Sequence, residues 1–124
     1  MSALTSKRCV PCAPGTPPLS KAAQDELGQQ VPDWSVVDGT RIRREYKFKT
    51  YLDGAAWVPL IGAIADAEDH HPDIHLYYRK VVVELWTHTV NGLSENDYIL
   101  AAKFDEHFKN LKTAVKEDQN GAAG

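Results

Sequence analysis

The clearest pattern in the chain is an alternation of charged and apolar residues between Arg41 and Lys49. One side of this segment carries Ile42, Tyr46 and Phe48, and the other side is charged throughout: Arg41, Arg43, Glu45, Lys47 and Lys49. A period of two residues is typical of a half-buried strand. Asp38-Gly39, just before this segment, is a strong hairpin signal and predicts a partner strand at residues 34–37.

A second pair of strands is predicted at residues 74–78 and 80–88. The longer segment carries large apolar side chains on both faces, with Val81, Val83 and Leu85 alternating with Val82 and Trp86. A strand that is apolar on both faces is typical of a sheet interior, where both faces are covered. We therefore expect residues 80–88 to form a central strand that is half covered on its second face.

Three segments have the spacing of amphipathic helices. The first begins at Ser20, a residue type that caps helix N-termini, and ends before Pro32. The second is expected over Tyr51–Asp69, where Pro59 should kink the helix or leave its first turns irregular. The third follows the capping-box sequence that starts at Ser94. Its apolar face is made of Leu100, Phe104, Phe108 and Leu111.

The predicted order of elements is therefore α-β-β-α-β-β-α. Strands joined by tight turns favour an antiparallel sheet, so we predict an α+β fold: a single domain whose four-stranded antiparallel sheet carries its helices on one face. Residues 1–18 contain many Pro, Gly and Ser and are predicted to be a flexible leader. Residues 19–112 are predicted to be the domain, and residues 113–124 a polar tail.

Composition narrows the function classes. The 124 residues suffice for one domain with a small core. The net charge of −3 gives no electrostatic reason to expect direct binding of nucleic acid. No apolar run approaches the ~20 residues of a membrane span, and no hydrophobic signal-peptide segment is present. We therefore expect no membrane association and a soluble protein of the cytoplasm.

The only cysteines form the sequence Cys9-Val10-Pro11-Cys12. Two ligands do not close a tetrahedral zinc site, and a second cysteine pair is absent. A thioredoxin-type pair would open a helix after a strand, whereas prolines follow here. The expected state is a mobile, reduced pair.

Four of the five histidines fall between residues 70 and 88: His70, His71, His75 and His88. Imidazole, with an ordinary pKa near ~6.5, can both give and take a proton near neutral pH. A metal site is one interpretation of this cluster. However, Pro72 opposes a helix there, and in a strand His71 and His75 would lie about 13 Å apart. The spacing therefore defines no metal site, and it favours acid–base chemistry by two or three imidazoles.

Three further motifs carry a family resemblance. They are Glu68-Asp69-His70-His71-Pro72-Asp73, then Tyr78-Arg79-Lys80-Val81-Val82-Val83-Glu84-Leu85-Trp86-Thr87-His88, then Gly92-Leu93-Ser94-Glu95-Asn96-Asp97. Together they resemble the pterin-4a-carbinolamine dehydratases, and the likeness runs from Leu19 through Trp34 to Phe108. The family's reaction eliminates water from 4a-hydroxytetrahydropterin and gives quinonoid dihydropterin, a step that recycles the tetrahydrobiopterin cofactor of aromatic amino acid hydroxylases.

The resemblance implies roles for seven residues. His70, His71 and His88 match the family's catalytic histidines. Four others match positions around the substrate: Asp66, Pro72, Trp34 and Asp97. Two of these have structural alternatives, since Asp97 suits a capping carboxylate and Trp34 suits a core aromatic residue. His75 matches no functional position and is expected to face solvent, and His107, on the third helix, is expected at the surface.

The resemblance also implies partners. No metal and no cofactor beyond the pterin substrate are expected, and the protein is expected to be a homo-oligomer, either a dimer or a tetramer. The physical reason drawn from the sequence is that the apolar face of the third helix exceeds what a small core can absorb. The alternative function is a non-catalytic scaffold or assembly partner on the same fold. The presence of His70, His71 and His88 favours catalysis.

Overall fold

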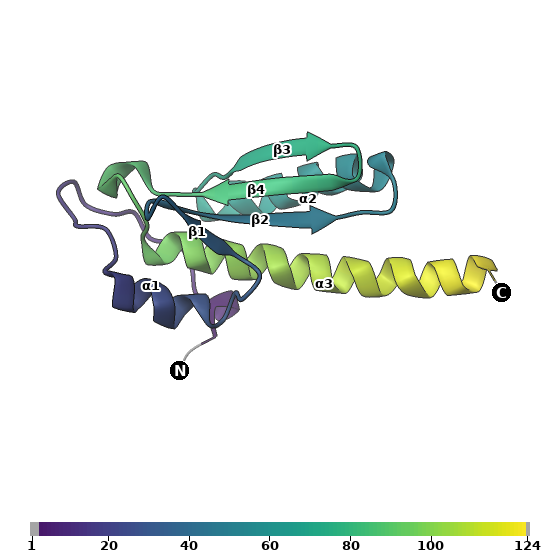
Figure 1. The fold of residues 1–124 in the computed structure, drawn as a ribbon, viewed down its shortest axis with the longest axis horizontal. Coiled ribbons are helices and arrows are strands. Elements are labelled where there is room, and N and C mark those ends of the chain that lie inside the picture. Colours follow the sequence, from purple (N-terminus) through teal and green to yellow (C-terminus); the bar gives the residue numbers. More distant parts are fainter. Residues whose placement is uncertain (1–2, 124) are drawn as a thin grey trace.

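A computed structural model describes the backbone of residues 3–123 and the side chains of residues 3–111 (Figure 1). Its elements are two short 3-10 helices, three α-helices and four strands. In chain order they are η1 (Leu4–Ser6), α1 (Lys21–Gly28), β1 (Ser35–Val37), β2 (Arg41–Lys47), α2 (Tyr51–Glu68), β3 (Asp73–Tyr77), β4 (Lys80–Leu85), η2 (His88–Val90) and α3 (Glu95–Ala123).

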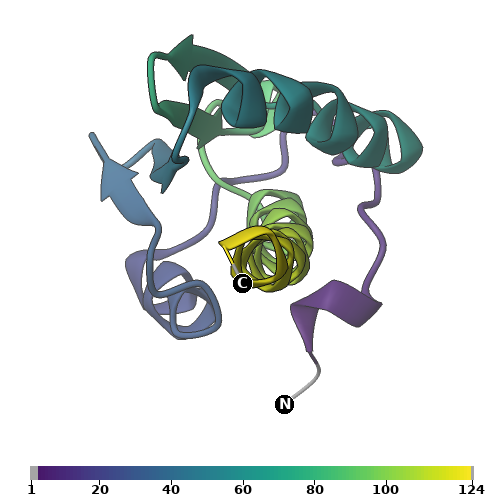
Figure 2. The same cartoon turned by 90° about the vertical axis from the view of Figure 1, so that its right-hand side faces the viewer.

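The four strands form one antiparallel sheet in the order β1-β2-β4-β3. The sheet curves around α3, and α2 lies along the β3–β4 side (Figure 2). The predicted α+β fold is confirmed, as is the central place of the strand that begins at Lys80. Asp38 and Gly39 both have positive φ, which explains why this pair makes the turn between β1 and β2.

One face of the sheet is covered and the other carries charge. Tyr46 of β2 packs against Trp57 of α2 and Phe108 of α3, with ring centroids 4.5 and 4.9 Å apart, so both helices cover the same face. On the opposite face, ion pairs join Arg43 to Glu45 and Glu84. The alternation along β2 therefore predicts correctly which side chains are buried.

Three details differ from the sequence-based expectations. Helix α2 is continuous through Pro59 and ends at Glu68, with Asp69 as a left-handed C-cap. Strand β4 ends at Leu85, before His88, because Thr87 pairs with Gly92 and closes a small loop. His107 is not a free surface residue, since its Nδ1 accepts a hydrogen bond from the buried indole of Trp57 at 2.9 Å.

The apolar face of α3 is absorbed by the chain's own core. Leu100 and Phe104 are fully buried, and Phe108 is nearly so. The expectation that this face exceeds the core was therefore wrong, because the curved sheet, α1 and the N-terminal segment surround α3. No helix in the described part of the chain is long and apolar enough to cross a bilayer.

The segment expected to be a flexible leader is packed where the structure describes it. Leu4 is buried in the core, and residues 8–10 hydrogen-bond to α2 and α3. This difference arises because the partners of the segment are far away in sequence. A polar tail was expected at residues 113–124. The side chains of these residues lie outside the described part of the chain, and the backbone continues α3 to Ala123.

Candidate active site

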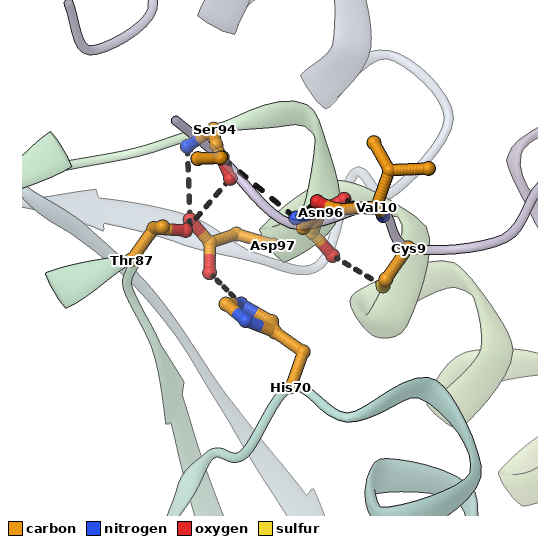
Figure 3. Close-up of polar contacts among 8 residues, drawn as sticks. Cys9, Val10, His70, Thr87, Ser94, Asn96 and Asp97 are labelled. Atoms are coloured by element: carbon orange, nitrogen blue, oxygen red, sulfur yellow. Dashed lines mark hydrogen bonds and ion pairs between the residues drawn. The ribbon is translucent and has the colours of Figure 1, made fainter. Parts of the chain in front are cut away.

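Two of the predicted site residues, His70 and Asp97, meet where the end of α2, the end of β4 and the start of α3 come together (Figure 3). His70, His71 and Pro72 form the link between α2 and β3. Asp69, with a φ of 50°, turns the chain out of the helix and so presents the two imidazoles beyond it. Asp97 lies in the first turn of α3.

The carboxylate of Asp97 is fully buried and fully hydrogen-bonded. Its Oδ2 accepts from the Thr87 hydroxyl at 2.8 Å and from the backbone N–H of Ser94 at 3.0 Å. The Thr87 hydroxyl is also 2.7 Å from that of Ser94. Because Thr87 uses its proton on Asp97, the Ser94 hydroxyl donates to Thr87. A buried carboxylate is tolerated only with such partners, so this network holds a negative charge in place.

The other carboxylate oxygen of Asp97 holds His70. The distance from His70 Nε2 to Asp97 Oδ1 is 2.6 Å, typical of a charge-assisted hydrogen bond. An ionised carboxylate only accepts hydrogen bonds, so Nε2 carries a proton and the neutral ring has its lone pair on Nδ1. The arrangement gives His70 a basic nitrogen, and Asp97 would stabilise the imidazolium that forms on protonation.

Asp97 has the capping role that the sequence offered and a contact with His70 besides, while its role at the substrate stays a prediction. It bonds to the backbone N–H of Ser94, as a capping-box carboxylate does, and it also holds His70. The two bonds use different oxygens.

His71 and Asp66 form a separate, exposed pair. His71 Nε2 lies 2.8 Å from Asp66 Oδ1, and the two side chains are 58% and 80% exposed. An ion pair at this exposure contributes little to stability. It does orient the His71 ring.

His88 is exposed and lies in η2, directly after Thr87. Its ring is stacked on Trp86, with centroids 3.8 Å apart and planes inclined by 36°. The stack restricts the orientation of the imidazole. His88 is thus one residue away from the Asp97 network, since Thr87 is part of that network.

Trp34 lies elsewhere in the fold. Its indole N–H donates to Asp105 of α3 at 3.0 Å, and its ring packs edge-on against Tyr46. Asp105 follows Asp97 by eight residues, or about 12 Å along a helix. These contacts favour the core role for Trp34, and its role in substrate binding stays a prediction.

The sequence motifs contained Thr87 and Ser94 but did not identify their role. Thr87 donates its hydroxyl and Ser94 its backbone N–H to Asp97, and their positions in Thr87-His88 and in the capping box were the available signal. Among the residues that the structure describes, no three His, Cys, Asp or Glu side chains converge as a metal site would require.

The fold and the site define a small single-domain α+β protein with a carboxylate-held histidine suited to proton transfer. Residues 17–107 match the family described as pterin 4 alpha carbinolamine dehydratase. The chain belongs to this family of hydro-lyases, which confirms the resemblance drawn from its motifs.

Individual relatives agree. A protein of Halorhodospira halophila, provisionally named a pterin-4-alpha-carbinolamine dehydratase, is 45% identical over 103 residues, covering 82% of this chain and 94% of that protein. One of Alkaliphilus metalliredigens with the same provisional name is 40% identical over 86% of this chain and 96% of its own length. A crystal structure of a transcriptional coactivator/pterin dehydratase from Brucella melitensis is 31% identical with a TM-score of 0.67, covering 72% of this chain and 96% of that one.

Proposed function

We propose that this chain removes water from 4a-hydroxytetrahydropterin and releases quinonoid dihydropterin by histidine acid–base catalysis. Family membership supports the substrate class, and the His70–Asp97 contact of 2.6 Å carries the assignment of the chemistry. In cells that hydroxylate aromatic amino acids, this reaction would recycle the tetrahydrobiopterin cofactor in the cytoplasm.

The elimination needs a base and an acid in one turnover. The base removes a proton from a ring nitrogen of the pterin, and the acid protonates the hydroxyl that leaves as water. His70 is the group suited to act as base, because its Nδ1 lone pair is free while Asp97 holds the opposite nitrogen. Asp97 stabilises the resulting imidazolium through a bond that is already formed.

His88 is assigned the acid role. It is exposed, so it can exchange protons with solvent between turnovers, and Trp86 fixes the plane of its ring. His71 is assigned the binding and polarising of the pterin. Asp66 occupies Nε2 of His71, so the pterin would meet the other ring nitrogen, Nδ1. Pro72 holds the turn that presents the two preceding residues, His70 and His71, to the substrate.

A rapid-mixing assay with freshly generated carbinolamine tests this proposal. The unaltered chain should accelerate dehydration, and His70→Ala should lose at least the ~10²-fold that a general base contributes. A chain that binds the pterin without accelerating its dehydration would favour the scaffold alternative. The Brucella melitensis protein, which is named a transcriptional coactivator as well as a pterin dehydratase, gives that alternative its support.

We also propose a homo-oligomer, dimer or tetramer, in which a second copy covers the outer face of α2. This helix is apolar on nearly all sides, and such helices are normally buried. Leu52 and Leu60 are 74% and 45% exposed. Ala56, Pro59 and Ala63 on the same face are also exposed. A second copy offers the same apolar surface, as a two-fold contact requires.

A further inference from the structure

The proposed reaction does not use the cysteine pair, although the pair lies beside the candidate site. Residues 8–12, here called the N-terminal strap, run from the last turn of α2 to the first turn of α3. The last turn of α2 lies just before His70 in the chain, and the first turn of α3 contains Asp97. The strap therefore joins the two elements that carry the predicted base and its carboxylate partner.

At α2 the strap is held by Glu68, whose carboxylate is nearly buried. Glu68 accepts the backbone N–H of Cys9 at 2.8 Å and pairs with Arg8 at 3.1 Å. Lys103 of α3 binds the same carboxylate at 3.0 Å. Burial favours the neutral acid, but these donors outweigh it and hold the pKa of Glu68 below its usual range. Glu68 precedes His70 by two residues.

At α3 the strap is held by Asn96, which is buried. The side chain of Asn96 accepts the N–H of Val10 at 3.0 Å and donates to the carbonyl of Val10 at 2.6 Å (Figure 3). The Asn96 side chain and the Val10 backbone thus exchange two hydrogen bonds, as two directly opposed residues do in an antiparallel sheet. Asn96 immediately precedes Asp97, so displacement of Asn96 would shift the carboxylate that holds His70.

Both cysteine sulfurs are also bound to Asn96. The thiol of Cys9 donates to the backbone carbonyl of Asn96, with Sγ 3.6 Å from the oxygen, and the amide of Asn96 reaches Cys12 Sγ at 3.9 Å. The Cys9 contact requires an S–H hydrogen, because a disulfide sulfur has no proton to donate. Both cysteines are free thiols in this structure.

We propose that Cys9 and Cys12 are a redox-sensitive pair whose oxidation to a disulfide releases the N-terminal strap from Asn96 and weakens the His70–Asp97 contact. The oxidant is a small-molecule disulfide. Each sulfur now lies against a different atom of Asn96, whereas a disulfide requires the sulfurs about 2.05 Å apart. Forming the disulfide removes the S–H hydrogen of Cys9, so the hydrogen bond from Cys9 to the Asn96 carbonyl is lost.

The disulfide forms by two successive thiol–disulfide exchange steps. The thiolate of Cys12 attacks the oxidant, forms a mixed disulfide and expels one small thiol. Cys9 then loses its proton, displaces the second small thiol and closes the Cys9–Cys12 bond. Cys9 is assigned the second step because burial, with the charge of Glu68, raises the pKa of its thiol to about 12. Two protein thiols are oxidised, and one small disulfide is reduced to two thiols.

The test uses the full chain treated with oxidised glutathione and then freed of it. We expect a mass decrease of about 2 Da, for the two hydrogens lost, reversed by dithiothreitol. The backbone N–H of Val10 should lose its protection from hydrogen exchange. Dehydration should slow by at least about tenfold, since a displacement of about 1 Å in an active site can cost about 10²-fold.

Cys9→Ser and Cys12→Ser are the matched controls, and neither should form the internal disulfide. Glutathione adducts without an internal disulfide would overturn the proposal, as would a disulfide that leaves both Val10 exchange and turnover unchanged. Only the effect on turnover rests on the proposed function. If the chain has no dehydratase activity but the disulfide forms and exposes Val10, the proposed function fails and the redox-sensitive strap stands.

Discussion

His70 and Asp97 lie 27 residues apart in sequence, and their side chains are joined by a contact of 2.6 Å between Nε2 and Oδ1. Asp97 is inaccessible to solvent, while the His70 side chain remains 13% exposed. The carboxylate is therefore shielded by protein while the imidazole it orients can meet a substrate. In this geometry a buried carboxylate can set the tautomer of the histidine that it holds.

Asp97→Asn should therefore lower the dehydration rate by at least ~10²-fold, because an amide can bind the wrong tautomer of His70 and does not stabilise an imidazolium. The double variant with His70→Ala should lose little more than either single variant, since the two residues act as a unit. Rapid-mixing kinetics measure both effects. Asp66→Asn is the control, and its pair with His71 is exposed, so it should cost much less.

Replacement by alanine should have very different effects at three of the histidines. His70→Ala and His88→Ala should each cost at least ~10²-fold in turnover. His75 is exposed on β3, and His75→Ala should be nearly silent. Equal damage from His75→Ala and His70→Ala would show that the acid–base roles are wrongly assigned.

Turnover should survive exhaustive chelation of metal ions. The described residues hold no group of three His, Cys, Asp or Glu side chains placed for a shared ion. Catalysis as proposed needs only imidazoles and the Asp97 carboxylate. Stoichiometric zinc in the purified protein, together with activity that disappears on its removal and returns with it, would contradict this prediction.

Glu68→Gln should destabilise the folded chain by about 1–3 kcal/mol near neutral pH, because Cys9, Arg8 and Lys103 lose a charged acceptor. The pKa of Glu68 is lowered on folding, so its contribution is complete above the ordinary value of ~4.3 and disappears as pH falls through the lowered value. Urea unfolding at a series of pH values should show the two chains converging in acid. A difference that does not change with pH would mean that the charge is not the cause.

Leu60→Lys should convert the proposed oligomer into a monomer, because it places a charge on the outer face of α2. Light scattering of the unaltered chain should give a multiple of the 13.8 kDa of one chain. A monomeric mass before substitution would sink the proposed interface. Asn110→Lys, which adds the same charge on an exposed part of α3, controls for a general effect of surface charge.

The sequence predicted best where a feature depends on neighbouring residues. The alternation in Arg41–Lys49, the turn at Asp38-Gly39 and the cap at Ser20 are local, and all three are present in the structure. The histidine pair after α2 was also foreseen, since Pro72 opposes a longer helix. These features follow from backbone preferences that act over a few residues.

Features that depend on distant contacts were not predictable in the same way. The position of His88 depends on the bond from Thr87 to Gly92, which ends β4 early. The place of Trp34 depends on Asp105, 71 residues further along the chain. Burial of the apolar face of α3 depends on how far the sheet curves, and no periodicity in one segment reports that.

The segment that matches the family begins later in the chain than the part that packs into the folded core. The match begins at residue 17, yet Leu4 fills part of the core and Cys9 satisfies a buried carboxylate. A chain shortened to residues 17–111 would leave a hole beside α3 and Glu68 without its backbone donor. Domain limits taken from sequence similarity alone would therefore remove part of this protein's interior.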